Sequence, residues 1–276
     1  MRYAIISDIH ANRQAFKAVL TDIRSNKADQ IICLGDLVGY GPEPAEVLSI
    51  AYSQIHHFVL GNHDAVICGK LSPSLFNDNA RQIIDWTASV LDNHAIKFFN
   101  GLPLVLAGQG FRCTHGEFTE PGRFGYIIEE EEAVSAFKAS DEQILFAGHS
   151  HYPCVFVSEK GNAGNLALFE PMDFNIAPNK RYIVNVGSVG QPRDEDIRAC
   201  YCIFDTEKKN VIFRKVPFDI EAYCSDLEKR KIPLKSSYFV GIYYREPIQP
   251  LRELLDFERI TTTQAVKTNS DIKNLE

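Results

Sequence analysis

The sequence lacks long hydrophobic runs. No apolar stretch among its 276 residues approaches the roughly 20 that a helix needs to cross a bilayer. The amino terminus also lacks the small-residue cleavage site of a signal peptide, because a predicted strand at residues 3–6 is followed directly by polar Ser7 and Asp8. We therefore expect a cytoplasmic protein that has no membrane partner.

Positive charge is also scarce. The chain has 29 Lys and Arg residues against 36 Asp and Glu residues, so its formal net charge is −7. A protein that binds duplex nucleic acid usually presents a basic face to the phosphates, and this balance argues against such a partner. A small phosphorylated substrate stays compatible with it, because bound divalent cations can reverse the local sign of the field.

Paired cysteine motifs are missing as well. The 7 cysteines are an odd number and none lies in a CxxC pair, which argues against a disulfide framework and favours reduced thiols. What remains is an ordinary globular composition, with 45% hydrophobic and 24% charged residues.

Apolar runs alternate with helical patterns through the first third of the chain. Strands are predicted near residues 3–6, 30–34 and 57–60, and helices near 13–24 and 44–52. This rhythm is typical of βαβ units that build a parallel sheet buried on both faces. Residues 76–99 have a helical pattern that contains the single tryptophan, and we interpret them as a helical insertion beside the strand ends, in the position of a cap.

The second half of the chain is richer in strands. They are predicted near residues 102–107, 111–114, 143–147, 155–157, 167–169, 182–186, 200–204 and 211–216, with helices near 129–139 and 220–230. The acidic run 129–132 is interpreted as a solvated first helical turn, where carboxylates meet the helix dipole favourably. The pattern fades after Pro250. We expect one domain over residues 1–250 and a polar tail over 251–276, which either moves freely or forms a contact in a homo-oligomer.

Polar clusters follow the predicted strands directly. They are Asp8 with His10, Asp36 after Gly35, the run Gly61-Asn62-His63-Asp64, His115 before Gly116, and the run Gly148-His149-Ser150-His151. The carboxyl ends of parallel strands gather at one edge of a sheet, so these clusters should meet in space. Within an extended segment, residues two apart face the same side, which would direct Asp8 with His10, and His149 with His151, into one site.

These side chains supply carboxylate, imidazole and amide oxygen, and no thiolate is among them. Such a donor set suits Mn²⁺, Fe or Zn²⁺. Any one cluster would be weak evidence, because a lone Asp is more often a cap and a lone His more often a structural hydrogen-bonding residue. Five clusters after five strands favour a metal site.

In this order, the clusters resemble the calcineurin-like metallophosphoesterase family, whose motifs run D-x-H, G-D, G-N-H-[DE], H and G-H-x-H. The resemblance covers residue 3 to about residue 219, and its one small departure is Thr114 before His115, where many relatives have glycine. The strings ISDIHAN, CLGDLVGYGP, LGNHD and VNVGSVGQPRD are similar to the YfcE-like bacterial phosphodiesterases and the diadenosine polyphosphate hydrolases. The resemblance implies a four-layer α/β/β/α sandwich.

The resemblance also implies a ligand set for two divalent ions, with Mn most expected and Fe, Zn, Ni or Co as alternatives. Asp8, His10 and His151 would hold the first ion, Asn62, His115 and His149 the second, and Asp36 would bridge both. Two ions about 3.5–4 Å apart can activate a shared water and stabilise charge on the attacking and leaving oxygens. The nucleophile would then be derived from water, with no covalent intermediate.

His63 has no metal assigned to it, which leaves its imidazole to act as a general acid or as a donor to the phosphoryl oxygen. Asp64 could orient that ring and raise its pKa, or it could be a helix N-cap, and the sequence favours neither interpretation.

Three more residues are candidates for substrate binding, each with a structural alternative. Asn12 stands where a helix begins, beside the predicted metals, so it is either a ligand for phosphate or an N-cap. Tyr40 would stack on a base or aryl group or pack in its turn. Arg193 would bind a distal phosphate or form a structural ion pair.

The sequence thus predicts a hydrolase for a phosphodiester or a nucleotide phosphoanhydride. A phosphomonoesterase is the nearest alternative, because it would use the same metal core. A non-catalytic scaffold like the retromer subunit Vps29 is an alternative of another class, which the complete ligand set argues against.

Overall fold

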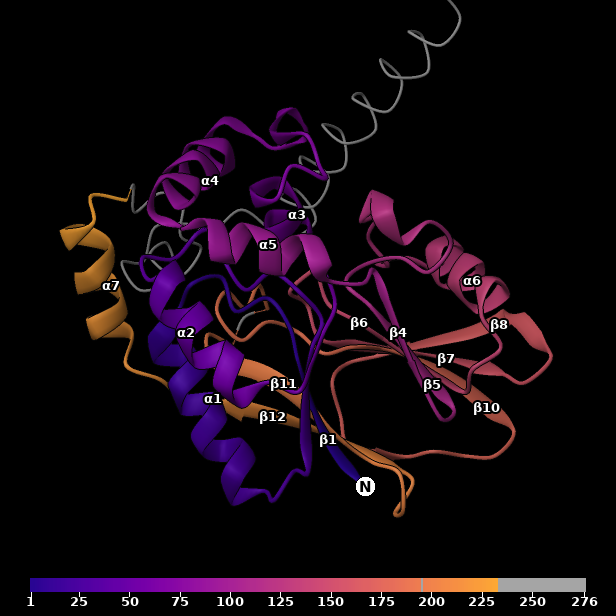
Figure 1. The fold of residues 1–276 in the computed structure, drawn as a ribbon. Helices are drawn as coiled ribbons and strands as arrows, with labels where there is room; N and C mark the ends of the chain where they lie inside the picture. The colour runs from indigo at the N-terminus through magenta and orange to yellow at the C-terminus, as the bar shows by residue number, and fades with distance from the viewer. Residues whose placement is uncertain (195, 233–276) are drawn as a thin grey trace, which may run out of the picture.

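The computed structural model describes residues 1–194 and 196–232, which form two six-stranded sheets packed face to face with helices on both outer sides (Figure 1). The first sheet has the order β3-β2-β1-β11-β12-β9 and comprises β1 (Arg2–Ile6), β2 (Gln30–Cys33), β3 (His57–Phe58), β9 (Phe174–Asn175), β11 (Ala199–Asp205) and β12 (Asn210–Val216). The second has the order β4-β5-β6-β10-β7-β8 and comprises β4 (Val105–Gly108), β5 (Phe111–Thr114), β6 (Ile144–Ala147), β7 (Cys154–Glu159), β8 (Asn162–Phe169) and β10 (Lys180–Asn185).

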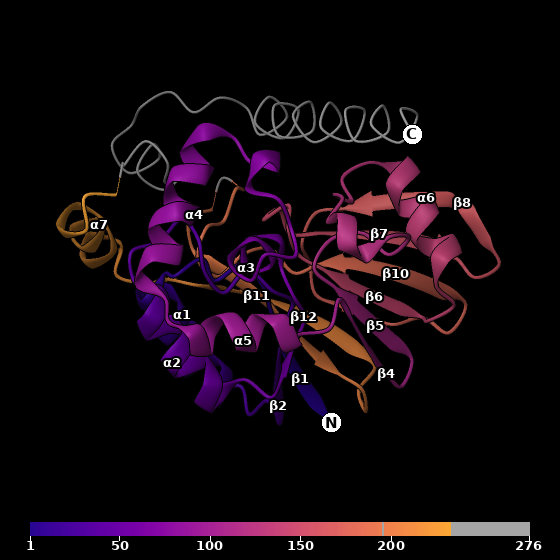
Figure 2. The same cartoon turned by 45° about the horizontal axis from the view of Figure 1, so that its top comes forward.

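Seven α-helices are described: α1 (Arg13–Ser25), α2 (Pro44–Gln54), α3 (Asn62–Ile67), α4 (Asp78–Val90), α5 (Asn93–Gly101), α6 (Glu130–Ala139) and α7 (Ile220–Lys229). Two 3₁₀ turns, η1 (Pro73–Leu75) and η2 (Pro121–Arg123), complete the described elements. The predicted four-layer α/β/β/α sandwich is confirmed, and the two views show the same order of layers (Figure 2).

The first sheet is mixed, although its βαβ part is parallel as predicted. Strands β1, β2 and β3 pair in parallel, whereas β11 pairs antiparallel with β1 and β12 pairs antiparallel with β11. The late strand β11 therefore returns to the centre of the sheet beside the first strand. Sequence rhythm identified these strands but could not show that partners from opposite ends of the chain would meet.

Alternating side chains of β1 enter two different cores. Ala4 and Ile6 pack with the apolar faces of α1 and α2, whereas Ile5 lies between the two sheets with Phe146 and Phe204. A strand that is buried on both faces has no polar side, which explains the continuous apolar run of residues 4–6. The second sheet is covered on its outer face by α6, whose Phe137 packs in a third core.

The predicted helical insertion at 76–99 consists of two helices. Helix α4 ends at Val90, and Asp92 caps the start of α5 by accepting a hydrogen bond from the backbone N–H of Ala95, with an N–O distance of 2.9 Å. Asp is a favoured N-cap, so the break follows from local chemistry. The short helix α3 begins within the Gly61-Asn62-His63-Asp64 motif, where the sequence indicated a helix start only through the N-cap alternative for Asp64.

No helix among the described residues is long and apolar enough to span a bilayer. The predicted domain boundary at residue 250 and the tail over 251–276 lie outside the described residues.

Candidate metal centre and its cavity

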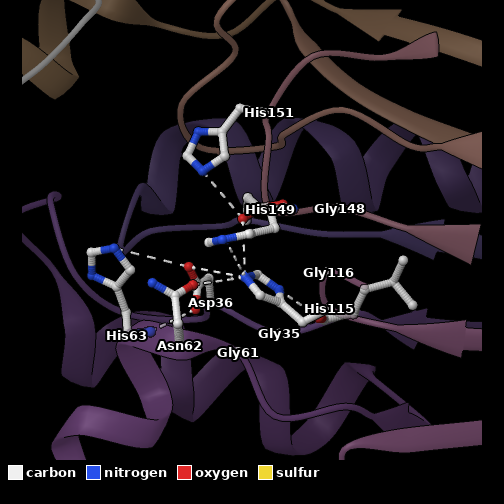
Figure 3. Close-up of polar contacts among 12 residues, drawn as sticks. Gly35, Asp36, Gly61, Asn62, His63, His115, Gly116, Gly148, His149 and His151 are labelled. Carbon is white, nitrogen blue, oxygen red and sulfur yellow. Dashed lines mark hydrogen bonds and ion pairs between the residues drawn. The ribbon is translucent and has the colours of Figure 1, made fainter. Parts of the chain in front are cut away.

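The predicted polar clusters meet where strands of both sheets end. Asp8 and His10 follow β1. Asp36 follows β2, and Asn62 and His63 open α3 after β3; from the second sheet, His115 follows β5, and His149 and His151 follow β6 (Figure 3). Each of these side chains except Asn62 belongs to a group whose possible ligand atoms lie within 4.8 Å of one another. The groups are Asp8 with His10 and His151, His10 with Asp36 and His63, and Asp36 with His115 and His149.

The backbone at the cluster is left-handed rather than extended. Residues Asp8, His10, Asp36, His149 and His151 have φ angles of 54°, 46°, 53°, 65° and 60°. The residue pairs two apart therefore converge as expected, but the reason is a sequence of tight turns and not the alternation of a strand. Non-glycine residues adopt this region at a cost, and such conformations gather at functional sites.

Two imidazoles point their lone pairs at each other in the first group. The Nδ1 atoms of His10 and His151 lie 3.1 Å from the carbonyl oxygen of Val38 and 2.7 Å from that of Gln191. Each Nδ1 therefore donates its proton to the backbone, which leaves both Nε2 atoms as acceptors only 3.1 Å apart. Two facing lone pairs repel unless a cation lies between them, so this group fits a metal ion.

The group of Asp36, His115 and His149 has a similar arrangement. His115 donates from Nδ1 to the carbonyl oxygen of Leu34 over 2.8 Å, so its Nε2 faces Nδ1 of His149 at 3.1 Å and Oδ1 of Asn62 at 2.9 Å. Burial lowers the pKa of His115, but Asp36 and Asp8 outweigh that effect and raise it to about 9. The position beside Nε2 thus attracts a positive charge, which a proton or a divalent cation can supply.

The two carboxylates each keep one oxygen for this cluster. Asp8 Oδ2 accepts a hydrogen bond from the backbone N–H of His149 at 3.0 Å, and Asp36 Oδ1 accepts one from His63 at 2.9 Å. Their other oxygens, Asp8 Oδ1 and Asp36 Oδ2, are buried without a hydrogen-bond donor and lie 3.2 Å from His151 Nε2 and 3.4 Å from His115 Nε2. Buried carboxylate oxygens need a partner, and a divalent ion would satisfy both.

Electrostatics keep these carboxylates ionised. Burial raises the pKa of Asp8, but the neighbouring imidazoles, led by His151, outweigh it and hold the pKa well below its ordinary value. His115 and His63 do the same for Asp36. Burial, reinforced by Arg193, lowers the pKa of His151 to about 4, which keeps that ring neutral and able to ligate.

Glycine is required where strands and turns approach these carboxylates. A Cβ atom on Gly61 would lie 2.1 Å from Asp36 Oδ1, and one on Gly148 would lie 2.6 Å from Asp8 Oδ2. Both glycines therefore make room for the acidic side chains, which gives the glycines of the motifs a physical role.

His63 lies beside the metal cluster with its ring held by aromatic neighbours. Its centroid is 4.6 Å from the ring of Tyr40 and 4.9 Å from that of Phe76, and its Nε2 is 4.0 Å from Asp36 Oδ2. Asp64 has different neighbours from those considered for it. Its carboxylate accepts hydrogen bonds from the backbone N–H groups of Leu37, Val38 and Gly61, and the N-cap of α3 is Gly61. In this geometry Asp64 braces the loop that carries Asp36.

The three candidate substrate residues differ in position. The amide of Asn12 is fully buried and used by the fold, because Oδ1 caps α1 at Ala15 and Nδ2 donates to the carbonyl of Gly190. Tyr40 packs against His10 and His63 and lines the cavity described below. Arg193 is buried, its backbone N–H donates to the carbonyl oxygen of His151, and it also lines this cavity.

A cavity of about 560 Å³ opens from the metal cluster. Its floor includes Asp36, Asn62, His149 and His151, while its walls come from two segments outside the motifs. One wall includes η1 and the start of α4, and the other comprises residues 117–128 and the first turns of α6. The sequence placed residues 76–99 beside the strand ends, but it did not single out the wall residues, because they belong to no motif and are ordinary apolar, aromatic and acidic side chains.

Comparison with known proteins agrees with this geometry. Residues 1–209 match the calcineurin-like phosphoesterase superfamily domain. The chain is 36% identical over 244 residues to the uncharacterized protein MJ0912 of Methanocaldococcus jannaschii, covering 86% of this chain and 97% of that protein. The crystal structure of a metallophosphoesterase from Sphaerobacter thermophilus superposes with a TM-score of 0.77 at 33% identity, covering 87% of this chain and 99% of that one.

A shorter match is to a protein whose name denotes hydrolysis of a nucleotide. Over 97 residues the chain is 34% identical to the symmetrical bis(5′-nucleosyl)-tetraphosphatase of Erwinia tasmaniensis, which covers 30% of this chain and 35% of that protein. This match accords with the branch of the family that the motif strings indicated. The chain belongs to the calcineurin-like phosphoesterase superfamily, and it is a metal-dependent phosphoric ester hydrolase.

Proposed function

We propose that this protein uses two divalent ions to hydrolyse a phosphodiester or a nucleotide phosphoanhydride. The ligands would be Asp8, His10 and His151 for one ion, Asn62, His115 and His149 for the other, and Asp36 for both. The observation that carries this proposal concerns Asp36 Oδ2, which is buried without a hydrogen-bond donor. Asp36 belongs to two groups of side chains whose possible metal ligands lie close together, one with His10 and the other with His115 and His149. The imidazole, carboxylate and amide donors suit Mn²⁺, Fe or Zn²⁺, and of these we expect Mn²⁺ to restore activity best.

The ions, when bound, would supply Lewis acidity and make a water molecule nucleophilic at neutral pH. The chain's own residues would bind and orient the ester. His63 lines the cavity beside the cluster and would give a proton to the leaving oxygen. Buried Arg193 would hold a phosphate oxygen at the same floor.

Few cations lie near the site, and this favours a diester over a monoester dianion. The additional negative charge of a monoester needs protein cations as well as metals. Arg13, at the start of α1, is a second cation close in sequence to the motifs, and it is paired with Glu43 at 2.6 Å and Asp226 at 3.5 Å. Arg193 lines the cavity and Arg13 does not, so Arg193 is the guanidinium that we assign to the phosphate. The nucleotide alternative draws support from the partial match to the tetraphosphatase.

A metal-reconstitution screen tests the proposal. The metal-stripped protein would be loaded with Mn²⁺ and assayed with bis-aryl phosphate, mono-aryl phosphate, a cyclic nucleotide and a dinucleoside polyphosphate. We expect a higher kcat/KM for the diester or polyphosphate than for the matching monoester, and we expect Arg193→Ala to weaken the polyphosphate most. A clear preference for monoesters would favour a phosphatase, and no response to Mn²⁺ would favour a scaffold. The cytoplasmic location and a homo-oligomer stay predictions.

A further inference from the structure

The cavity continues beyond the metal cluster between two walls that the fold leaves partly uncovered. Leu75 of η1 stands on one wall and Ile128, just before α6, on the other. Both views show α4 and α6 on opposite sides of the strand ends (Figures 1 and 2). The cavity volume of about 560 Å³ is ample for an organic group in addition to a phosphate, since small-molecule sites span about 300–1,000 Å³.

Much of the wall surface is apolar and aromatic. Phe76, Phe118 and Phe124 line it, together with half-buried Leu75 and Ile128. Leu75 and Ile128 belong to none of the hydrophobic clusters formed by the described residues. Apolar side chains that line a cavity without joining a core gain little from folding, whereas a bound apolar group would remove their surface from water.

The charged side chains of the walls have the wrong sign for a second phosphate. Three carboxylates that are outside the proposed ligand set line the cavity, on Glu117, Glu131 and Glu132. The cation on the same wall, Arg123, is paired with Glu120 at 2.6 Å. An anionic substituent extending toward this wall would meet like charges within a Debye length, which repel it.

We propose that the wall region is a subsite for an uncharged aromatic substituent of a phosphodiester, and that its carboxylates disfavour substrates that extend a further anionic group there. This inference rests on the proposed function and narrows it, because it favours the diester over the polyphosphate. An aromatic ring matches the walls in two ways: its faces pack on Leu75 and Ile128, and its positive edge suits neighbouring carboxylates.

Calorimetric binding to the Mn²⁺-loaded protein tests the subsite without requiring turnover. Phenylphosphonate and methylphosphonate carry the same phosphonate group and differ in the organic part. We expect phenylphosphonate to bind roughly tenfold tighter, and Leu75→Ala and Ile128→Ala each to remove several-fold of that preference. Leu168→Ala removes an exposed leucine of β8 outside the cavity and should change neither affinity.

The proposed effect of the wall carboxylates on anionic substrates is tested with a second pair of ligands and a second pair of variants. A para-carboxylate on phenylphosphonate should weaken its binding, and Glu131→Gln should reduce that penalty about two- to fivefold, a modest effect because Glu131 is exposed. Glu130→Gln is the control, because Glu130 lies in the same exposed first turn of α6 but does not line the cavity.

The outcomes separate this inference from the proposed function. Equal affinities for the phenyl and methyl ligands, in a protein that hydrolyses diesters with Mn²⁺, would overturn the aromatic subsite and leave the hydrolase intact. A phenyl preference that Leu75→Ala and Ile128→Ala leave unchanged would also overturn it. Failure to hydrolyse any ester would overturn the proposed function, while the binding comparison would still decide the subsite.

Discussion

Asp36 is the residue on which the proposed binding of two metal ions depends most. One of its oxygens is anchored by the backbone of His63, and the other faces both groups of imidazoles. Asp36→Asn should lose metal and nearly all activity, because a neutral amide oxygen cannot hold two dications as a shared carboxylate can. Metal analysis of the purified variant measures the loss. Asp85→Asn, on the exposed face of α4, is the control, and two ions with normal turnover in Asp36→Asn would contradict the bridge.

His63 separates metal binding from proton transfer. His63→Ala should keep both ions and lower kcat by about 10²–10⁴, the range for loss of a general acid. Esters with good leaving groups should lose less, because they need less help from a proton donor. Turnover of nitrophenyl and alkyl esters decides the role: an equal loss for both would leave His63 with phosphoryl positioning only.

The residues of the metal cluster were predictable, whereas several of their neighbours were not. Asp36 and His149 could be found because each follows an apolar strand within a short glycine-containing motif. Asn12 and Asp64 were ambiguous because Asn and Asp serve equally as ligands and as acceptors for backbone N–H groups. Only the folded chain brings Leu37 N–H within reach of Asp64, and no local pattern encodes that contact.

Helix α1 is fastened to the first sheet by a polar contact as well as by its apolar face. Asp22 accepts a hydrogen bond from the hydroxyl of buried Tyr201 at 2.7 Å and pairs with Arg214 at 2.9 Å. These contacts join the helix to β11 and β12. The sequence predicted the helix and both strands. Their contacts could not be predicted, because the contacting residues are 179 and 192 positions apart in the sequence.

Asp22→Ala should lower the free energy of unfolding by about 1–3 kcal/mol at pH 7, because it leaves the Tyr201 hydroxyl without its acceptor. The hydrogen bond from Arg214 lowers the pKa of Asp22 below its ordinary value, even against the effect of burial. A lowered pKa in the folded state stabilises the fold above the unfolded pKa of about 3.9, and this part is lost as the pH falls through the folded value.

Urea unfolding of the wild type and Asp22→Ala at several pH values provides the measurement. The difference between their unfolding free energies should begin to narrow below about pH 4, where Asp22 of the unfolded chain becomes protonated, and should narrow further as the pH falls through the lower pKa of the folded state. Asp85→Ala serves as the exposed control and should stay close to the wild type. A difference that does not change with pH would mean that packing, and not the ionised carboxylate, fastens the helix.

At the scale of the whole molecule, the metal cluster joins the two sheets. Asp8 and Asp36 extend from the first sheet, and His115 and His149 extend from the second. The sheets otherwise meet through an apolar core, in which Ile5 and Phe146 take part. Ions held by ligands from both sides therefore bind only the folded arrangement, so their binding free energy adds to stability.

Metal removal should consequently lower the melting temperature of the whole domain, independently of any assay of activity. A ligand at 100 times its Kd stabilises the folded state by about 2.7 kcal/mol, and a domain of this size shifts by roughly 2–4 °C per kcal/mol. We expect the Mn²⁺-loaded protein to melt about 5–10 °C above the chelator-treated protein, and the shift to grow with Mn²⁺ concentration. Calorimetric melting of the wild type and Asp36→Asn at matched Mn²⁺ concentrations measures it. The variant should lose most of the shift, because its cluster cannot bridge two ions. If chelation left the wild type unchanged, or if Asp36→Asn responded to Mn²⁺ as strongly as the wild type, the cluster would not be the metal site that joins the sheets.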